Sequence, residues 1–398
     1  MKISLTNIII KDNIVLQKDF DIVVIQSHIR ILLNNMKTKI LLILHLPPPI
    51  HGAAMVGKYI YDSKIINDGF NCQYINLALA KDLKDIGKGG IIKLVNFIQK
   101  LKLIRQTVQS FKPDLCYVTP NAKGGAFYKD FVVVQLLKLM GCKVIVHYHN
   151  KGVSTKQDYW LDNLLYTHFF KNIKVILLAK SLYPDFSKYV QPSNLYICPN
   201  GIPQTRILSP IQHKRFNILF LSNMMKEKGV WTLLKACKIL KENNRIFECH
   251  FVGKWSDITQ EVFEEKVQEY KLNDSVFAHG AQYGNNKNKY WQACDLFVFP
   301  TYYHNESFPM VLLEAMQQKK ACISTNEGGI PEIIIPDQTG YLIPKQDHVS
   351  LADKISYLID HQDLCAQMGK NGLIRYNQLF TLQKFEENFV SIIKDCLK

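Results

Sequence analysis

The 398-residue sequence has no apolar run long enough for a membrane-spanning helix, which needs about 20 such residues. Its ten cysteines are scattered singly, without a Cys-x-x-Cys pair or a zinc-type cluster. We therefore expect reduced, mostly buried thiols in a cytoplasmic protein. Acidic side chains are scarce, 34 against 49 lysines and arginines, and the net charge of +15 favours an anionic partner. Such a partner is a nucleic acid, a membrane surface or a phosphorylated substrate. Nucleic acid is the least favoured of the three, because the sequence has no zinc-finger spacing and no aromatic RNA-binding strand.

Short apolar runs that resemble strands alternate with helical segments in two series. The first series comprises residues 39–45, 72–77, 114–118, 142–147, 174–179 and 195–198. The second comprises residues 216–221, 247–252, 276–278, 296–299 and 321–324. Strands that alternate with helices predict parallel sheets with helices on both faces. The length and the two series together predict an α/β fold of two Rossmann-like, doubly wound domains that face each other across a cleft.

Turn residues concentrate at 199–210, so we place the domain boundary there. The predicted divisions are an N-terminal extension (1–36), a first domain (37–205), a second domain (206–375) and a closing helix that crosses back to the first domain (376–398). Because Met36 precedes a natural start for the first strand, translation from Met36 is a hypothesis. The Asp19-Phe20-Asp21 motif lies in the extension, and we attribute it to chance.

Two glutamates, Glu306 and Glu314, are the most informative residues of the chain. The run 295–300 predicts a buried strand, a polar loop follows, and Phe308-Pro309-Met310 begins a predicted helix. A strand, a loop and a helix N-terminus form an anion site, because unpaired N–H groups and the helix dipole face the loop. Glu314 lies about two turns into the helix, where a carboxylate can accept hydrogen bonds from ribose or sugar hydroxyls. The alternative is that Glu306 only favours the helix start and Glu314 is merely solvated.

A second glycine turn follows, Asn326-Glu-Gly328-Gly329-Ile-Pro331-Glu332, after a predicted strand. With the two glutamates eight residues apart, this stretch resembles the nucleotide-sugar site of glycosyltransferase family 4, the retaining GT-B enzymes called glycosyl transferases group 1. The resemblance implies transfer of a sugar from a nucleoside-diphosphate sugar to a hydroxyl of a glycan or lipid-linked acceptor, in surface polysaccharide or lipopolysaccharide biosynthesis. It also implies catalysis without a metal or other cofactor.

The resemblance implies a role for each matching residue of the second domain. Glu314 would hold the ribose and Glu306 the donor sugar. Backbone groups around Ser307, Phe308, Pro309 and Met310, together with Lys228, would stabilise the departing diphosphate. The family has Gly-Arg where this chain has Ser222-Asn223, so Asn223 takes the position of the usual arginine and Lys226 is the expected substitute cation. Surface lysines at a helix start are the alternative interpretation of Lys226 and Lys228.

The first domain carries two matching features. Gly52 and Ala53 follow the first strand in a small-residue loop, which resembles the donor-phosphate loop of the family. His149 ends a later strand, at the position of the family histidine that faces the donor sugar. His147 is the weaker match and is equally explained as a hydrogen-bonded histidine at the sheet edge. Zinc binding by His147 and His149 is disfavoured, because no third ligand stands at a helpful spacing.

Residues 88–112 predict a helix with six basic residues and no acidic one. Ile91, Leu94, Val95, Ile98 and Leu101 recur at helical spacing. Either these residues form a core-facing stripe under a solvated basic face, or the helix contacts anionic lipid at the inner face of the plasma membrane.

Two further alternatives concern the function of the whole chain. The loss of arginine at Asn223 allows a nucleotide-sugar-binding protein without transferase activity, and the architecture allows a nucleotide-sugar 2-epimerase.

Overall fold

The computed structural model describes residues 37–48, 52–77, 91–211 and 213–398, apart from the side chains of residues 91–93. The predicted extension with Asp19 and Asp21, the loop residue His51 and the basic Lys88 lie outside the described residues. In the part that is described, no helix is both long enough and apolar enough to cross a membrane.

The first domain is built on a six-stranded parallel sheet in the order β2-β1-β3-β4-β5-β6. Its strands are β1 (Lys39–Leu44), β2 (Asn71–Asn76), β3 (Leu115–Val118), β4 (Val144–His147), β5 (Lys174–Leu177) and β6 (Leu195–Ile197). Its helices are α2 (Gly52–Asp62), α3 (Lys64–Gly69), α4 (Ile91–Phe111), α5 (Gly124–Leu139) and α6 (Trp160–Phe170), with the short 3-10 helices η3 (Lys180–Asp185) and η4 (Pro192–Asn194).

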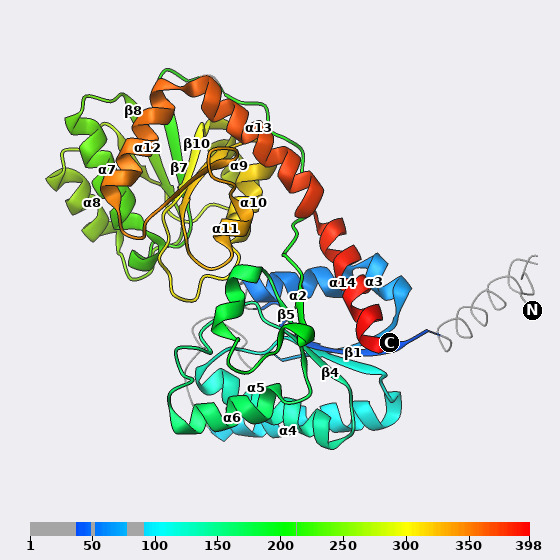
Figure 1. Cartoon of the computed structure of the whole chain (residues 1–398). Helices are drawn as coiled ribbons and strands as arrows, with labels where there is room; N and C mark the ends of the chain where they lie inside the picture. Colours follow the sequence, from blue (N-terminus) through cyan, green and yellow to red (C-terminus); the bar gives the residue numbers. More distant parts are fainter. Residues whose placement is uncertain (1–36, 49–51, 78–90, 212) are drawn as a thin grey trace, which may run out of the picture.

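Both faces of this sheet are buried, as the apolar strand runs predict. On β1, Ile40 and Leu42 belong to the core beneath α2 and α3, whereas Leu41 and Ile43 belong to the core beneath α4, α5 and α6. Figure 1 shows these two helical layers on opposite sides of the sheet.

The second domain repeats the architecture with a six-stranded parallel sheet in the order β12-β11-β10-β7-β8-β9. Its strands are β7 (Phe216–Leu221), β8 (Phe247–Val252), β9 (Val276–Ala278), β10 (Leu296–Phe299), β11 (Ala321–Thr325) and β12 (Gly340–Ile343). Its helices are η5 (Lys226–Lys228), α7 (Val230–Glu242), α8 (Gln260–Glu269), α9 (Gly284–Ala293), α10 (Met310–Gln317), α11 (Ile330–Ile333), α12 (His348–Asp360) and α13 (Gln362–Leu379). The predicted fold of two doubly wound α/β domains is confirmed.

The chain passes between the domains twice, and the two connections lie side by side. The N–H of Ile202 donates to the carbonyl of Phe380 at 3.1 Å, and the N–H of Leu382 donates to the carbonyl of Ile202 at 2.8 Å. After this crossing, α14 (Leu382–Leu397) returns to the first domain (Figure 1), where Phe385 and Phe389 join the core of α2 and α3. The C-terminal helix therefore ties the second domain to the first.

The core-stripe prediction for α4 is wrong in its first turns. Leu94, Val95 and Ile98 are 59%, 45% and 56% exposed. The buried face is instead carried by Ile104 and Val108, with Leu101 partly buried against them. The physical reason is that the sheet beneath a helix sets which face becomes buried. In the described turns, Phe97 and Leu101 join Ile104 and Val108 on the core-facing side of α4.

Candidate active site

The centre of the predicted site is an ion pair between Lys228 and Glu306. Glu306 lies in the loop between β10 and α10, and Lys228 ends η5, the short helix that follows β7. The Nζ of Lys228 donates to Oε2 of Glu306 at 2.5 Å, and the two side chains are only 15% and 11% exposed. The ammonium also lies 4.4 Å from the ring centroid of Tyr303. Two elements from different parts of the domain thus hold a fixed cation against a carboxylate.

Glu314 projects from the second turn of α10 and is partly exposed. Its Oε2 accepts a hydrogen bond at 2.8 Å from Lys287, a residue of α9 that the sequence did not single out. Burial and, second, the negative charge of Glu314 raise the pKa of Tyr59, which belongs to α2. Glu314 therefore lies on the side of α10 that faces the first domain.

The glycine turn after β11 packs directly on the loop that carries Glu306. The N–H of Gly329 donates to the carbonyl of Ser307 at 2.6 Å. Gly328 has a φ of +55°, and a Cβ placed there would lie 2.2 Å from the carbonyl oxygen of Glu306. Because only glycine fits this conformation and this approach, the turn fixes the position of Glu306.

The residues after Glu306 form the entrance to α10. Ser307, Phe308 and Pro309 are buried, and Pro309 is the N-cap of the helix. Pro309 has no N–H, so it cannot donate to an anion as its neighbours can. In the described part of the chain, no hydrogen-bond partner meets the buried Oγ of Ser307. The available donors at this helix start are the backbone N–H groups on either side of Pro309 and the Ser307 hydroxyl.

The small-residue loop of the first domain meets this helix start. Gly52 is the first residue of α2, and a Cβ placed on it would lie 3.8 Å from Cε of Met310, the first residue of α10. Ala53 is half-buried in the same turn. The N-termini of two helices, one from each domain, therefore lie close together, and both helix dipoles favour an anion in the region between them.

Lys228, Lys226 and Asn223, the residues at the predicted cation positions, differ in their surroundings. Lys228 pairs with Glu306, but Lys226 and Asn223 are exposed. The backbone N–H of Lys226 donates to Asp257 at 3.1 Å. Lys228 is thus the predicted cation that the structure brings to Glu306.

The two histidines at the end of β4 differ in their surroundings. His147 is fully buried, and its Nδ1 lies 2.8 Å from the hydroxyl of Tyr117. Burial first, and the neighbouring His149 second, hold the pKa of His147 well below its ordinary value. The His149 ring centroid lies 4.2 Å from that of His147, and the His149 side chain is half-buried. His147 is a neutral structural residue. Both ring nitrogens of His149 are also shielded from solvent, so its place beside the donor sugar stays a prediction.

A second cluster joins the domains directly and was missed by the sequence reasoning. Glu327, which precedes the glycine turn, binds Lys151 of the first domain through Oε1 and Lys345 of the second through Oε2, the latter at 2.5 Å. Burial opposes the ionisation of Glu327, but hydrogen bonds from both lysines outweigh it and lower its pKa. Nearby, the N–H of Ser181 in η3 donates to Oε1 of Glu332 at 2.7 Å. These contacts fix how the first domain sits against the glycine turn.

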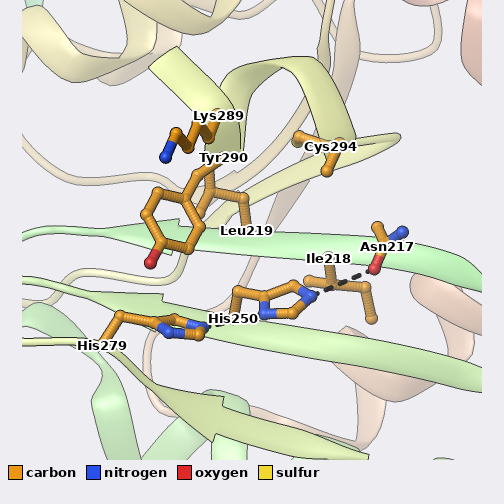
Figure 2. A pocket seen from close by; sticks show the side chains of 9 residues that line it. Asn217, Ile218, Leu219, His250, His279, Lys289, Tyr290 and Cys294 are labelled. Atoms are coloured by element: carbon orange, nitrogen blue, oxygen red, sulfur yellow. Dashed lines mark hydrogen bonds between the residues drawn. The ribbon is translucent and has the colours of Figure 1, made fainter. Parts of the chain in front are cut away.

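A pocket of about 270 Å³ lies under α9, among residues that the sequence reasoning did not select (Figure 2). Asn217 donates from Nδ2 to the carbonyl of Arg215, so its Oδ1 accepts from Nε2 of His250 at 3.2 Å. The Nδ1 of His250 lies 3.0 Å from Nε2 of His279, so one of these nitrogens donates to the other. This bond needs one acceptor nitrogen, so the two imidazoles cannot both be protonated.

Residues 203–375 match the family model of glycosyl transferases group 1. The chain is 26% identical over 191 residues to the capsular polysaccharide biosynthesis glycosyltransferase CapM of Staphylococcus aureus, covering 46% of this chain and 47% of CapM. It is 29% identical over 182 residues to the N-acetyl-alpha-D-glucosaminyl L-malate synthase of Bacillus anthracis, covering 46% of each. The chain thus aligns with about half the length of the curated relatives it matches.

Solved structures share the whole fold at low sequence identity. HepE of Anabaena, solved in complex with UDP, has a TM-score of 0.69 to this chain at 17% identity, over 90% of this chain and 100% of HepE. The two parallel-sheet domains have the GT-B arrangement. The match to the glycosyl transferases group 1 model, over residues 203–375, includes every strand of the second sheet.

Proposed function

We propose that this chain is a retaining glycosyltransferase of family 4, which moves a sugar from a nucleoside-diphosphate sugar to a hydroxyl of a glycan or lipid-linked acceptor. The observation that carries the proposal is the Lys228–Glu306 pair at the start of α10, opposite Gly52 at the start of α2. The cation and the helix N-termini suit a diphosphate, and the carboxylate suits the hydroxyls of a sugar beside it.

In the proposed reaction, the bond between the anomeric carbon and the diphosphate oxygen breaks, and a bond from that carbon to the acceptor oxygen forms on the same face. The acceptor hydroxyl gives its proton to the departing diphosphate oxygen on the same face, and the diphosphate leaves with its remaining negative charge. Lys228 and the backbone N–H groups at the start of α10 stabilise that charge. Preorganised donors of this kind account for much of the rate enhancement in many enzymes.

The remaining residues of the site position the donor. Glu314 accepts hydrogen bonds from the ribose, Glu306 from the donor sugar, and His149 faces that sugar from the first domain. Lys287 holds the Glu314 carboxylate in place until the ribose binds. The ammonium of Lys228 and the helix N-termini take the role that a divalent metal has in other transferases, so the proposed reaction needs no cofactor.

The proposed setting is surface polysaccharide or lipopolysaccharide assembly at the inner face of the plasma membrane. CapM, one of the relatives, is named for capsular polysaccharide biosynthesis. The net charge of +15 favours a location beside an anionic membrane surface.

A panel of UDP-, GDP- and ADP-sugars tests the proposal in two steps. At 100 times its Kd, a bound donor should stabilise the protein by about 2.7 kcal/mol, which thermal unfolding detects. The same donor should then be hydrolysed slowly, or its sugar transferred to an added acceptor, in the presence of EDTA. Binding without turnover would identify a nucleotide-sugar-binding protein, and a product epimerised at C2 would identify an epimerase. Either outcome would overturn the proposal.

A further inference from the structure

The helical layer on the outer side of the first domain exposes large apolar side chains. On α4 these are Leu94, Val95 and Ile98, on α5 Leu139, and on α6 Trp160 and Leu164. Trp160 and Leu139 are 78% and 86% exposed. We call the outer surface of α4, α5 and α6 with these six residues the apolar-basic face. Single exposed apolar residues are ordinary, but these six stand on three helices that pack side by side, α4 on α5 and α5 on α6.

Charge on the apolar-basic face has one sign. Helix α4 has no acidic residue, and the acids of α5 and α6, Asp130 and Asp162, are both buried. Exposed cations stand on the same helices, Lys102 and Arg105 on α4 and Lys129 on α5. Two exposed acids flank the three helices in the sequence, Asp114 after α4 and Asp158 before α6. The face therefore offers cations and apolar groups together.

We propose that the apolar-basic face docks on an anionic lipid bilayer. Lysine and arginine are attracted to anionic headgroups, and their aliphatic stems lie along apolar surface while the charge stays in water. Tryptophan prefers the membrane–water interface, because its ring is apolar and its N–H is polar. The complementary charge favours lipid over a second protein as the occupant.

The position of the face allows docking and catalysis at once. Figure 1 shows α4, α5 and α6 on the side of the first sheet opposite α2 and α14. Gly52 and the start of α10 lie on the α2 side. A bilayer on the apolar-basic face would leave the donor region uncovered. The inference rests on the proposed lipid-linked acceptor for its purpose, but its test needs no turnover.

Sedimentation of the full chain with lipid vesicles tests this inference. We expect binding to vesicles of phosphatidylcholine with phosphatidylglycerol, and little binding to phosphatidylcholine alone. The double substitution K102E/R105E should weaken binding to the anionic vesicles at least about tenfold. The matched control is K235E/K370E, which changes the net charge equally at exposed positions of the second domain and should bind as the wild type does.

Tryptophan fluorescence tests whether the apolar side chains of the apolar-basic face contact the lipid. Of the four tryptophans, all of them in the described residues, only Trp160 is exposed, so a blue shift on vesicle binding should disappear in W160F. The substitution W160S/L164S should weaken binding, whereas Y283S/I246S, at exposed positions of the second domain, should not. Equal sedimentation of wild type and K102E/R105E would overturn the inference. A concentration-dependent dimer that W160S/L164S abolishes would also overturn it, by identifying the face as a protein interface.

Failure here is distinguishable from failure of the proposed transferase. Hydrolysis of the donor in vesicle-free buffer should be unchanged in K102E/R105E. If the wild type hydrolyses the donor but does not bind anionic vesicles, the lipid inference is wrong and the proposed transferase activity is supported. If it binds the vesicles but hydrolyses no donor, the proposed activity is wrong and the lipid inference is supported.

Discussion

Lys228 and Glu306 hold each other in a partly desolvated position, so each substitution has two effects. K228M removes the cation at the diphosphate and leaves the Glu306 carboxylate, 11% exposed, without its partner. We predict a loss of about 100-fold or more in kcat/KM and of about 1–3 kcal/mol in stability. Steady-state kinetics and urea unfolding measure the two effects.

A double-mutant cycle separates the pair from its surroundings. E306Q should lower activity to a similar extent, and K228M/E306Q should be less destabilised than the sum of the two single variants, because no charge is then left unpaired. Additive stability losses would contradict the pairing, and wild-type turnover in either single variant would remove the pair from the reaction.

The histidines under α9 predict how stability depends on pH. Burial first, and the neighbouring His250 second, lower the pKa of His279 to about 4. Burial also lowers the pKa of His250. The unfolded chain takes up protons below a pKa of about 6.5, whereas folded His279 does so only near 4. The stabilisation is therefore complete above pH 6.5 and is lost as the pH falls from 6.5 towards 4.

The comparison with H279N isolates this contribution. Burial raises the pKa of Asp130 to about 6, so this carboxyl contributes with the opposite sign in an overlapping range. Urea midpoints at pH 7.5 and 5 should fall more in the wild type than in H279N, in which position 279 cannot titrate. An equal fall in both proteins would contradict the assignment.

At the scale of elements, the glycine turn between β11 and α11 supports the loop that carries Glu306. G328A forces a Cβ to within 2.2 Å of the Glu306 carbonyl oxygen at a φ of +55°. The matched control is G141A, whose φ of +75° carries the same backbone penalty, about 1–2 kcal/mol, but whose Cβ would meet nothing within 4 Å. We predict that G328A loses about 1–3 kcal/mol more than G141A and that it alone loses activity. Thermal unfolding and donor hydrolysis of both variants decide this.

Most elements could be predicted because buried parallel strands are continuous apolar runs. The predicted strands 216–221 and 247–252 match β7 and β8 at both ends. Strand β12 was missed, because this four-residue edge strand begins at Gly340 and lacks such a run. The core-stripe interpretation of α4, one of two that the sequence left open, named the wrong residues for a different reason. Spacing shows that a helix has an apolar side, but the packing partner decides which turns are covered.

At the scale of the whole molecule, Lys151 and Glu327 connect the two domains. K151M removes this ion pair between the domains, whereas K345M removes the other lysine on Glu327 and leaves the pair in place. The Ser181–Glu332 bond and the docking of α14 remain in both variants. We predict that K151M loosens the contact between the domains and raises the KM for the donor about tenfold, equivalent to 1.4 kcal/mol. Small-angle scattering should show a larger radius of gyration for K151M than for K345M. Identical scattering and KM in the two variants would contradict the role of Lys151.

The sequence pattern could not reveal such pairs, because their partners are far apart in the chain. Lys151 and Glu327 are 176 residues apart, and Gly52 and Met310 belong to helices of different domains. The motif placed Glu306 and Glu314 on one helix entrance because that spacing is local. The lysines that bind them, Lys228 and Lys287, come from other elements. Lys228 was predicted from the family resemblance alone, and Lys287 was not predicted.

The most direct measurement of the central claim is calorimetric titration of the preferred nucleotide and of its 2′,3′-dideoxy analogue. The proteins compared are the wild type, E314Q and the control E265Q, whose glutamate is exposed on α8. If Glu314 holds the ribose, E314Q weakens binding of the ribonucleotide about tenfold or more but leaves the dideoxy analogue unaffected, and E265Q matches the wild type for both ligands. Equal weakening of both ligands in E314Q, or no binding of any nucleotide to the wild type, would contradict the account.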